Sequence, residues 1–543
     1  MERKIIIVLL QLMIVLGMSG CKKEQVLVDD YGASTKRALK QNAEGKIILG
    51  EKIENAYSVE NMRKAYESLK KQGKIKPVLS EEIDIKANCL YVRFLPQNRA
   101  DLNVLWSDTT LELFDYPLDY EIKEEGCYYR DPNIPEGLPT WQYTVVPVDY
   151  AFSGMKYEII EECFIPDEDG EKSKLQGSDY ENLLAAIEYE SMRLTGNLAE
   201  EEKEQADLND GMRWPSKKNP EGYMQVYNTS KGLEGVIRAK VRTHRIVNIS
   251  SDYTEENGHY RIPRGYRYNV HYSLIFTNKT GFKIWGNWAF LAPACYNMGW
   301  HSKKGFNKDI YKESKAWLWS TVNNGTYVYR EKLCPKFGIK KPPVDLRLWT
   351  VRMLGNWAGS TPMARQISLA VSTLKDLLIG YGVTWGTNYM SLVMPDVFIL
   401  QDYTDTRKAY STVFHELAHA SHYTQAGKWY WLCYIAGIIK NEGYGNGGGG
   451  NDGYIGVGEM WGNYFGYICE KDYFGWAILE GTDDWYRPDI LKRLDDEIYG
   501  ISPQKIFHCL QNEVRSHSKL KNKLISSYGH SSQINSIFSD YGF

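Results

Sequence analysis

Alternating hydrophobic and polar positions mark the first half of the chain as rich in β-strands. Between residues 266 and 276, large hydrophobic residues alternate with arginine, asparagine, histidine and serine, which is the period of a strand with one buried face. Shorter hydrophobic runs at 90–95, 111–114 and 143–146 are separated by proline, asparagine and aspartate. This pattern predicts further short strands that are joined by turns.

Helical spacing of hydrophobic residues dominates the second half of the chain. The clearest pattern begins at an N-cap, Thr404 or Asp405, and ends at Gly427, which suits the position after a helix. The hydrophobic run at 397–400 directly before it predicts a buried strand. Another strand is expected at 346–351, and helices are expected at 180–194, 311–322, 364–380, 429–440, 459–473, 502–524 and 531–538.

Together these elements predict a multidomain protein in which N-terminal β-rich modules precede an α+β domain. The charged stretch 195–222 is expected to be a linker. The expected divisions are a signal peptide at 1–20, a tether and helical lead-in at 21–85, a β-rich domain with a helix and linker at 86–222, a β-sandwich at 223–290, and the α+β domain at 291–543.

The N-terminus has the pattern of an export signal. Arg3 and Lys4 precede the hydrophobic stretch 5–15, and small residues then lead to Cys21. This segment resembles a bacterial lipobox, although Met18 stands where leucine is usual, and the resemblance implies a lipid anchor on Cys21. We therefore expect an outer-membrane lipoprotein at the cell surface or the periplasmic face. A plain secretory signal with an incidental cysteine is the alternative.

Composition narrows the classes of partner and cofactor. With 65 basic and 68 acidic residues the net charge is −3, which argues against a nucleic-acid partner bound by bulk electrostatics. The eight cysteines after Cys21 are scattered without a CxxC pair, so a cysteine-bound zinc site is not expected. Either disulfides, for example within Cys89, Cys127 and Cys163, or buried thiols would suit an exported chain of this size.

Metal chemistry is indicated by His415, Glu416 and His419, which lie inside the predicted helix 405–427. Positions four residues apart are about 40° apart around a helix, so both imidazoles emerge from one face and could bind one Zn²⁺. Glu416 points beside such a metal ion and could take a proton from an activated water as general base. The motif resembles that of the zincin metallopeptidases, and the resemblance implies zinc-dependent peptide hydrolysis by an α+β zincin-like catalytic domain.

The third ligand has two candidates. His422 and Gln425 occupy the positions where the metzincin subclass has Gly and His, so a downstream glutamate is expected, as in the gluzincins. Glu442 runs into a stretch with seven glycines between 443 and 453, which disfavours a rigid helix. Glu459 begins a strong helical pattern, and we prefer it over Glu442.

Other residues could support the site. Asn463 lies one turn after Glu459 and could hydrogen-bond the outer nitrogen of a ligating histidine. His422 lies on nearly the same face as His419, and it could contact substrate or replace a ligand, although a structural role is the simpler expectation. Candidates for the donor to the oxyanion are Tyr454, Tyr464, Tyr467 and His530, and the sequence does not choose among them.

Two further resemblances complete the prediction. A resemblance to the carboxypeptidase-regulatory-like β-sandwich is carried by residues 233–236 and 257–260, with the Asn257-Gly258 turn. The histidines of this region, His244, His259 and His271, are expected to be exposed. Residues 415–423 and 458–467 together resemble predicted zinc-metallopeptidase lipoproteins of Gram-negative bacteria.

The predicted function is a zinc peptidase acting on a peptide, protein or glycoprotein. The alternatives are a surface binder of peptide or glycan with a degenerate zincin domain, or hydrolysis of another bond.

Overall fold

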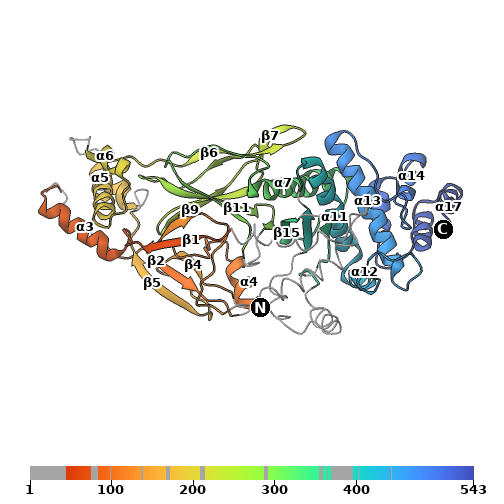
Figure 1. The fold of residues 1–543 in the computed structure, drawn as a ribbon, viewed down its shortest axis with the longest axis horizontal. Coiled ribbons are helices and arrows are strands. Elements are labelled where there is room, and N and C mark those ends of the chain that lie inside the picture. Colours follow the sequence, from red (N-terminus) through yellow and green to blue (C-terminus); the bar gives the residue numbers. More distant parts are fainter. Residues whose placement is uncertain are drawn as a thin grey trace, which may run out of the picture.

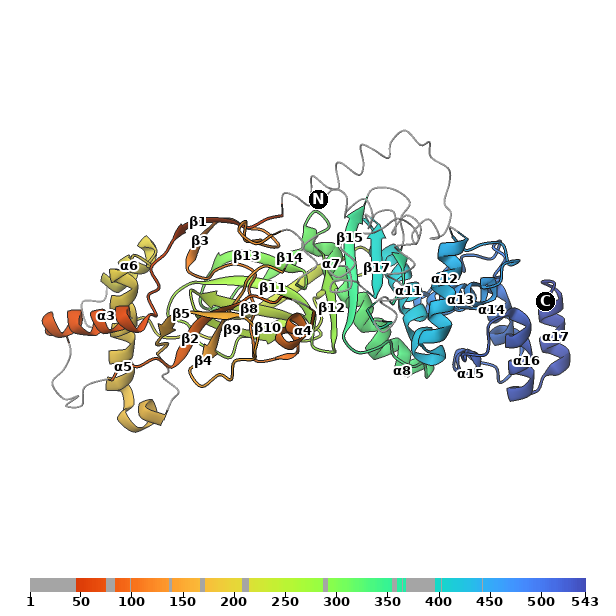
Figure 2. The same ribbon diagram turned by 90° about the horizontal axis from the view of Figure 1, so that it is seen from below.

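The computed structural model is elongated, and the last part of the chain, from α11 to α17, lies at one end of its long axis (Figure 1). Helices lie at one end, β-sheets in the middle and a larger group of helices at the C-terminal end, and Figure 2 shows the same order from below. This multidomain-like mixture, with β-rich sheets first and helices last, agrees with the predicted fold class at this coarse level. The structure describes residues 45–74, 84–97, 99–135, 139–166, 171–207, 214–286, 292–353, 359–363, 365–367, 396–401, 403–441 and 443–543.

Several predictions therefore lie outside the described residues. These are the signal at 1–20 with the lipid-anchor cysteine Cys21, the expected helix at 364–380 apart from residues 365–367, and the alternative ligand Glu442. Among the described helices, none is long and apolar enough to span a membrane.

The N-terminal part combines small antiparallel sheets with helices. Strand β2 is central in its sheet, where it pairs with β4 on one side and β5 on the other, and its tyrosine, valine and phenylalanine side chains are buried. The elements are β1 (Ile48–Lys52), α3 (Val59–Lys71), β2 (Cys89–Phe94), α4 (Arg99–Ser107), β3 (Tyr120–Glu124), β4 (Gln142–Pro147), β5 (Tyr157–Cys163), α5 (Glu171–Leu194) and α6 (Glu200–Asp207).

Two sheets form the middle of the molecule. Strands β10, β6 and β14 lie in one sheet, in which β7 also pairs with β6, and β16-β17-β15-β12-β11-β8-β9 form the other, in which β13 also pairs with β11. The bounds are β6 (Glu221–Asn228), β7 (Gly232–Gly235), β8 (Ala239–Arg245), β9 (Asn248–Tyr253), β10 (His259–Arg261), β11 (Val270–Asn278), β12 (Phe282–Trp285), β13 (Cys295–His301), β14 (Lys308–Ile310), β15 (Leu346–Met353), β16 (Gly359–Ser360) and β17 (Val397–Gln401).

The C-terminal helices pack on the end of the larger sheet (Figures 1 and 2). They are α7 (Lys315–Tyr327), which continues as a π-helical turn over Val328–Leu333, α8 (Cys334–Phe337), α11 (Thr406–Ala426), α12 (Lys428–Lys440), α13 (Asp452–Phe474), α14 (Asp489–Glu497), α15 (Pro503–Cys509), α16 (His517–Tyr528) and α17 (Ser531–Ser539). The expected helix at 502–524 is therefore two helices, with a break at 510–516.

The larger sheet runs across the expected division at residue 290. Strand β12 pairs in parallel with β15, and β11 pairs with both β8 and β13, so strands from both sides of 290 share hydrogen bonds. One hydrophobic core reaches from Met224 in β6 to Phe538 in α17. The strands of the middle sheets and the C-terminal helices therefore share one core, which supports the candidate site.

Three local expectations are wrong. Residues 111–114 form no strand, because only Phe114 makes a single bridge, to Tyr143. The expected linker 195–222 contains helix α6. His244 and His271 were expected to be exposed, but they are buried, with exposed fractions of 4% and 0%. Their rings lie 4.9 Å apart, next to the rings of Phe114 and Trp300.

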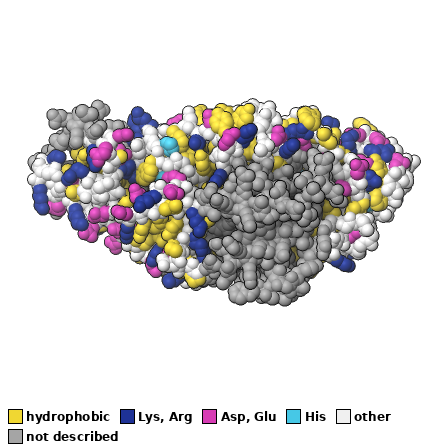
Figure 3. All heavy atoms as spheres, viewed as in Figure 1, with side chains coloured by type: hydrophobic (Ala, Val, Ile, Leu, Met, Phe, Trp, Pro, Cys, Tyr) yellow, Lys and Arg dark blue, Asp and Glu magenta, His cyan; other side chains and the backbone are white. Residues whose placement is uncertain are grey.

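One face of the molecule carries a group of exposed hydrophobic side chains. Figure 3 shows hydrophobic side chains gathered over the β2–β4–β5 sheet, where Val148, Tyr157 and Ile159 are exposed.

The eight cysteines after Cys21 are free thiols, and Cys89 and Cys163 lie opposite each other on β2 and β5. The possible disulfide within Cys89, Cys127 and Cys163 is therefore absent from the described structure.

Candidate metal centre

Helix α11 carries the motif, and its ends form as predicted. The Asp405 side chain accepts a hydrogen bond from the backbone N–H of Lys408 at 2.9 Å, which caps the helix, and Gly427 ends it with a φ of 85°. Burial of Val413, Phe414 and Leu417 fixes the helix against the core. The face that bears His415 and His419 is thereby turned toward helix α13.

Glu459 comes from α13, which begins at Asp452, seven residues before the expected start at Glu459. Asp452 holds the preceding glycine-rich loop, because its carboxylate accepts hydrogen bonds from the backbone N–H groups of Gly447 and Gly449, both at 2.9 Å. The loop thus leads into a long rigid helix, and Glu459 lies about two turns into it rather than at a flexible end.

Three donor groups converge between α11 and α13. The Nε2 atoms of His415 and His419 are 3.0 Å apart, and carboxylate oxygens of Glu459 lie 3.6 Å and 3.3 Å from them, respectively. Ligands bound at 2.0–2.1 Å around a tetrahedral ion are about 3.3 Å apart, so the three separations match the edges of one face of such a site. We call these three residues the triad.

Two glycines permit this close approach of the helices. A Cβ atom on Gly462 would lie 2.6 Å from Cε1 of His419, and one on Gly466 would lie 3.2 Å from Cα of His415. Gly458, one turn earlier, faces the ring of Tyr434 in the same way. The spacing of these glycines at every fourth position was a sequence signal for a helix–helix contact beside Glu459.

Burial and charge set the protonation of the triad. Burial lowers the pKa of His419 to about 4, which keeps its imidazole neutral and able to bind a metal ion. Burial also opposes protonation of His415, but the carboxylates of Glu459, Glu416 and Glu480 outweigh it and raise the pKa of that imidazole. Burial opposes ionisation of Glu459 too, yet the two histidines lower its pKa and keep it a carboxylate.

Glu416 lies beside the triad and is held by a contact that the sequence analysis missed. The Thr361 hydroxyl donates to its Oε2 at 2.7 Å, and the Trp431 indole N–H donates to the Thr361 carbonyl at 2.8 Å. Burial raises the pKa of Glu416 to about 7, against the lowering effects of His415 and Thr361. A carboxylate with such a pKa is matched to general-base chemistry near neutral pH.

The side chains around the triad make contacts that differ from those predicted for Asn463 and His422. Asn463 donates to the backbone carbonyl of Glu459 at 2.9 Å, and within the described chain Nδ1 of His419 has no hydrogen-bond partner. His422 is fully buried against Tyr430 with both ring nitrogens unpartnered among the described residues. Tyr434 of α12 donates instead to Glu459, an orienting contact that no sequence pattern indicated.

The candidate oxyanion donors are separated by the structure. Tyr467 lines a cavity of about 70 Å³ together with His415 and Glu416. Tyr464 donates its hydroxyl to Asp495, whereas the Tyr454 hydroxyl accepts from Arg515 and His530 is exposed. Among these four, Tyr467 alone is a lining residue of that cavity.

Comparison of the chain with protein-family models, with curated proteins and with solved structures finds no match. The geometry of the site and the resemblance of its motifs therefore carry the functional argument.

Proposed function

We propose that this protein is a zinc-dependent peptidase in which His415, His419 and Glu459 hold the metal ion. The single observation that carries the proposal is the convergence of two imidazole nitrogens and one carboxylate at 3.0, 3.3 and 3.6 Å. The donor set suits zinc, which binds neutral imidazole and carboxylate and leaves a fourth position open in catalytic sites.

Bound zinc would supply a Lewis acid that polarises the scissile carbonyl and acidifies water. Glu416 then takes the proton of the attacking water and returns it to the leaving amine, and Thr361 keeps its carboxylate oriented for both transfers. Tyr467 donates to the oxyanion as charge develops, because it lines the cavity next to His415.

The export pattern extends the proposal to location and substrate. A chain anchored through lipid on Cys21 acts at the outer membrane, on peptides or proteins, including glycoproteins, outside the cytoplasm. The net charge of −3 supports a partner other than nucleic acid.

A non-catalytic surface binder is the second candidate. A cavity of about 330 Å³ lies between the N-terminal part and the sandwich strands, with Trp106, Tyr253 and Trp285 in its lining. Its volume is within the range of ligand pockets, and aromatic rings suit glycan or peptide. This candidate predicts binding that does not depend on Glu416.

The deciding experiment compares Glu416→Gln with the wild type on a proteome-derived peptide library. The exchange removes the base but retains shape and metal ligands, so hydrolysis should fall by about 10²–10⁴-fold while zinc content is unchanged. Glu313→Gln, at an exposed position outside the cavity, is the matched control. Unchanged hydrolysis in Glu416→Gln would reject the assigned mechanism.

A further inference from the structure

The cavity beside the triad is lined by negative charge. Its charged lining residues other than histidine are Glu416, Glu470 and Glu480, and the described lining contains neither lysine nor arginine. A cavity with one sign of charge favours a group of the opposite sign. The three carboxylates differ, however, in whether the chain already neutralises them.

Glu470 is neutralised within the fold. It is 4% exposed, and the Arg407 guanidinium donates to its carboxylate. Arg407 in turn stacks on the ring of Trp476 at 3.2 Å, which fixes the pair. Glu470 is therefore part of the wall of the cavity and offers no free charge to a ligand.

Glu480 is different, because it is exposed and has no ion-pair or hydrogen-bond partner in the described part of the chain. Its carboxylate nevertheless faces the site. It lines the cavity together with His415 and Glu470, and its charge raises the pKa of Glu470, after the larger effect of burial. No described neighbour compensates the charge that Glu480 brings to the cavity.

The loop that carries Glu480 is held in place. Gly481 adopts a φ of 77°, and a Cβ atom on it would lie 2.9 Å from the Tyr486 ring and 3.4 Å from Cγ of Asn463. Its carbonyl accepts from the N–H of Asp484 at 3.1 Å in a turn. Ile478, two residues before Glu480, is 66% exposed and lines the same cavity. The loop therefore presents one free carboxylate and one apolar side chain to a substrate.

We infer that the cavity receives a positively charged group of the peptide substrate, with Glu480 as its counter-ion. This inference rests on the proposed peptidase function. The volume of about 70 Å³ accommodates a small charged group, such as a free N-terminal ammonium or the end of a lysine or arginine side chain. Ile478 packs against the aliphatic part of that residue.

The test uses the full-length, zinc-loaded protein and one cleaved peptide made in three forms. One form is unmodified, one has an acetylated N-terminus, and one has norleucine in place of its lysine. The wild type should cleave the unmodified form about tenfold faster than the form that lacks the recognised charge, since a charge-assisted contact is lost. Sensitivity to acetylation identifies the N-terminus as the ligand, and sensitivity to norleucine identifies the side chain.

The decisive variant is Glu480→Gln, which should reduce this preference to about twofold or less. Asp483→Asn on the same exposed loop makes the same charge change outside the cavity and should keep the preference. Binding of the three peptides to Glu416→Gln, measured by calorimetry, should rank them in the same order without turnover.

The outcomes separate this inference from the function beneath it. Cleavage of all three peptides at equal rates, or a preference that survives Glu480→Gln, overturns the inference alone. Absence of any cleavage by the zinc-loaded wild type overturns the proposed function, and the inference falls with it.

Discussion

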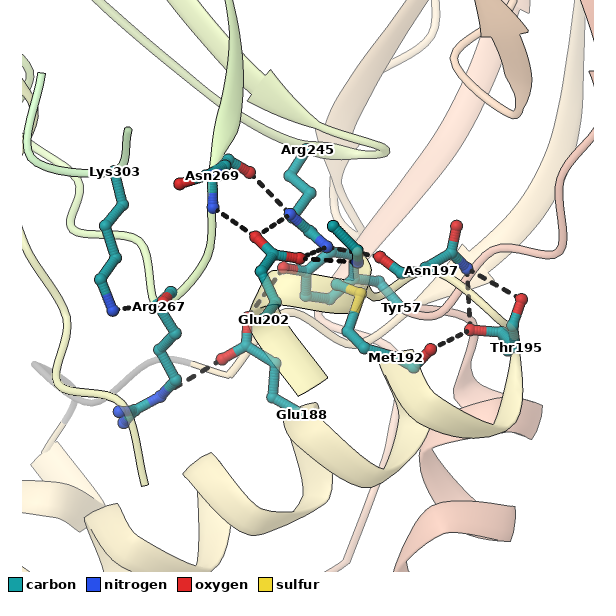
Figure 4. Close-up of polar contacts among 11 residues, drawn as sticks. Tyr57, Glu188, Met192, Thr195, Asn197, Glu202, Arg245, Arg267, Asn269 and Lys303 are labelled. Atoms are coloured by element: carbon teal, nitrogen blue, oxygen red, sulfur yellow. Dashed lines mark hydrogen bonds and ion pairs between the residues drawn. The ribbon is translucent and has the colours of Figure 1, made fainter. Parts of the chain in front are cut away.

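Two buried groups of ionisable side chains in this molecule differ in whether positive and negative side chains balance. The first, which we call the network, comprises Glu188, Glu202, Arg245 and Arg267, between helices α5 and α6 and the larger sheet (Figure 4). Arg245 binds both oxygens of Glu202, at 3.2 Å and 3.0 Å, and both side chains are less than 10% exposed. Arg267 pairs with Glu188 at 3.4 Å.

The triad has no such internal balance. One carboxylate and two imidazole nitrogens face one another, and neither the triad nor the described lining of its cavity contributes a lysine or arginine. The network is complete because the chain provides both signs of charge, so its role is structural. Under the proposed function, a metal cation from outside the chain would complete the triad, and this would distinguish it from an internal ion pair.

The largest expected effect on stability is in the network. Arg245→Met should lower the free energy of unfolding by about 3–5 kcal/mol, because Glu202 stays buried without its partner. Denaturant unfolding measures the loss, and zinc content of the folded protein should be unchanged. The double variant Arg245→Met, Glu202→Leu should recover most of it. A single variant within 1 kcal/mol of wild type would contradict the structural role.

Stabilisation of the protein by zinc should depend on the triad and not on the network. Free zinc at a hundred times its dissociation constant should stabilise the wild type by about 2.7 kcal/mol, and a chelator should reverse this. Glu459→Ala should abolish the difference between the two conditions, whereas Arg245→Met should keep it. Equal stabilisation of Glu459→Ala by zinc would place the metal elsewhere.

The next test concerns the close packing of helices α11 and α13 at the triad. Gly462→Ala places a Cβ 2.6 Å from the His419 ring and should destabilise the protein by about 1–3 kcal/mol and weaken zinc binding. Gly450→Ala, where a Cβ meets nothing within 4 Å, is the control and should have little effect on either measurement. Thermal unfolding and zinc titration report both quantities. Wild-type behaviour of Gly462→Ala would argue against this packing.

The effect that is smallest near neutral pH concerns the titration of His422. Burial lowers the pKa of His422 to about 3, so the unfolded chain takes up a proton first as the pH falls below about 6.5. Stability from the neutral imidazole is therefore complete above pH 6.5 and is lost toward pH 3. His422→Phe should reduce the slope of unfolding free energy by up to about 1.4 kcal/mol per pH unit in that window. An unchanged slope, measured on chelated protein, would show that His422 does not titrate as a buried group.

Local patterns predicted the elements that carry the chemistry. The caps at Asp405 and Gly427 are properties of short sequence stretches, and the helix between them forms as expected. Preference for Glu459 over Glu442 rested on glycine content, and the structure places Glu459 beside the histidines. A helix was also expected at 429–440, where α12 forms, but the contribution of its Tyr434 to the site was not expected.

Tertiary contacts account for what the sequence did not reveal. His244 and His271 alternate along strands as exposed residues would, yet Tyr116 and Glu125 of the N-terminal part pair with them. Thr361 lies in a stretch without a periodic pattern, and only the fold brings it to Glu416. Strand pairing between β12 and β15 likewise joins segments about 60 residues apart, which no local pattern encodes.

Metal analysis of the purified full-length protein tests the proposed site most directly. Elemental analysis after dialysis should find one zinc ion per wild-type chain, and isosteric Glu459→Gln should lose it while Glu313→Gln retains it. Substitution with cobalt should give the absorption spectrum of a tetrahedral site in the wild type and in Glu313→Gln, but not in Glu459→Gln. A wild-type chain that binds no zinc, or a Glu459→Gln variant that binds it equally well, would contradict a metal centre built from His415, His419 and Glu459.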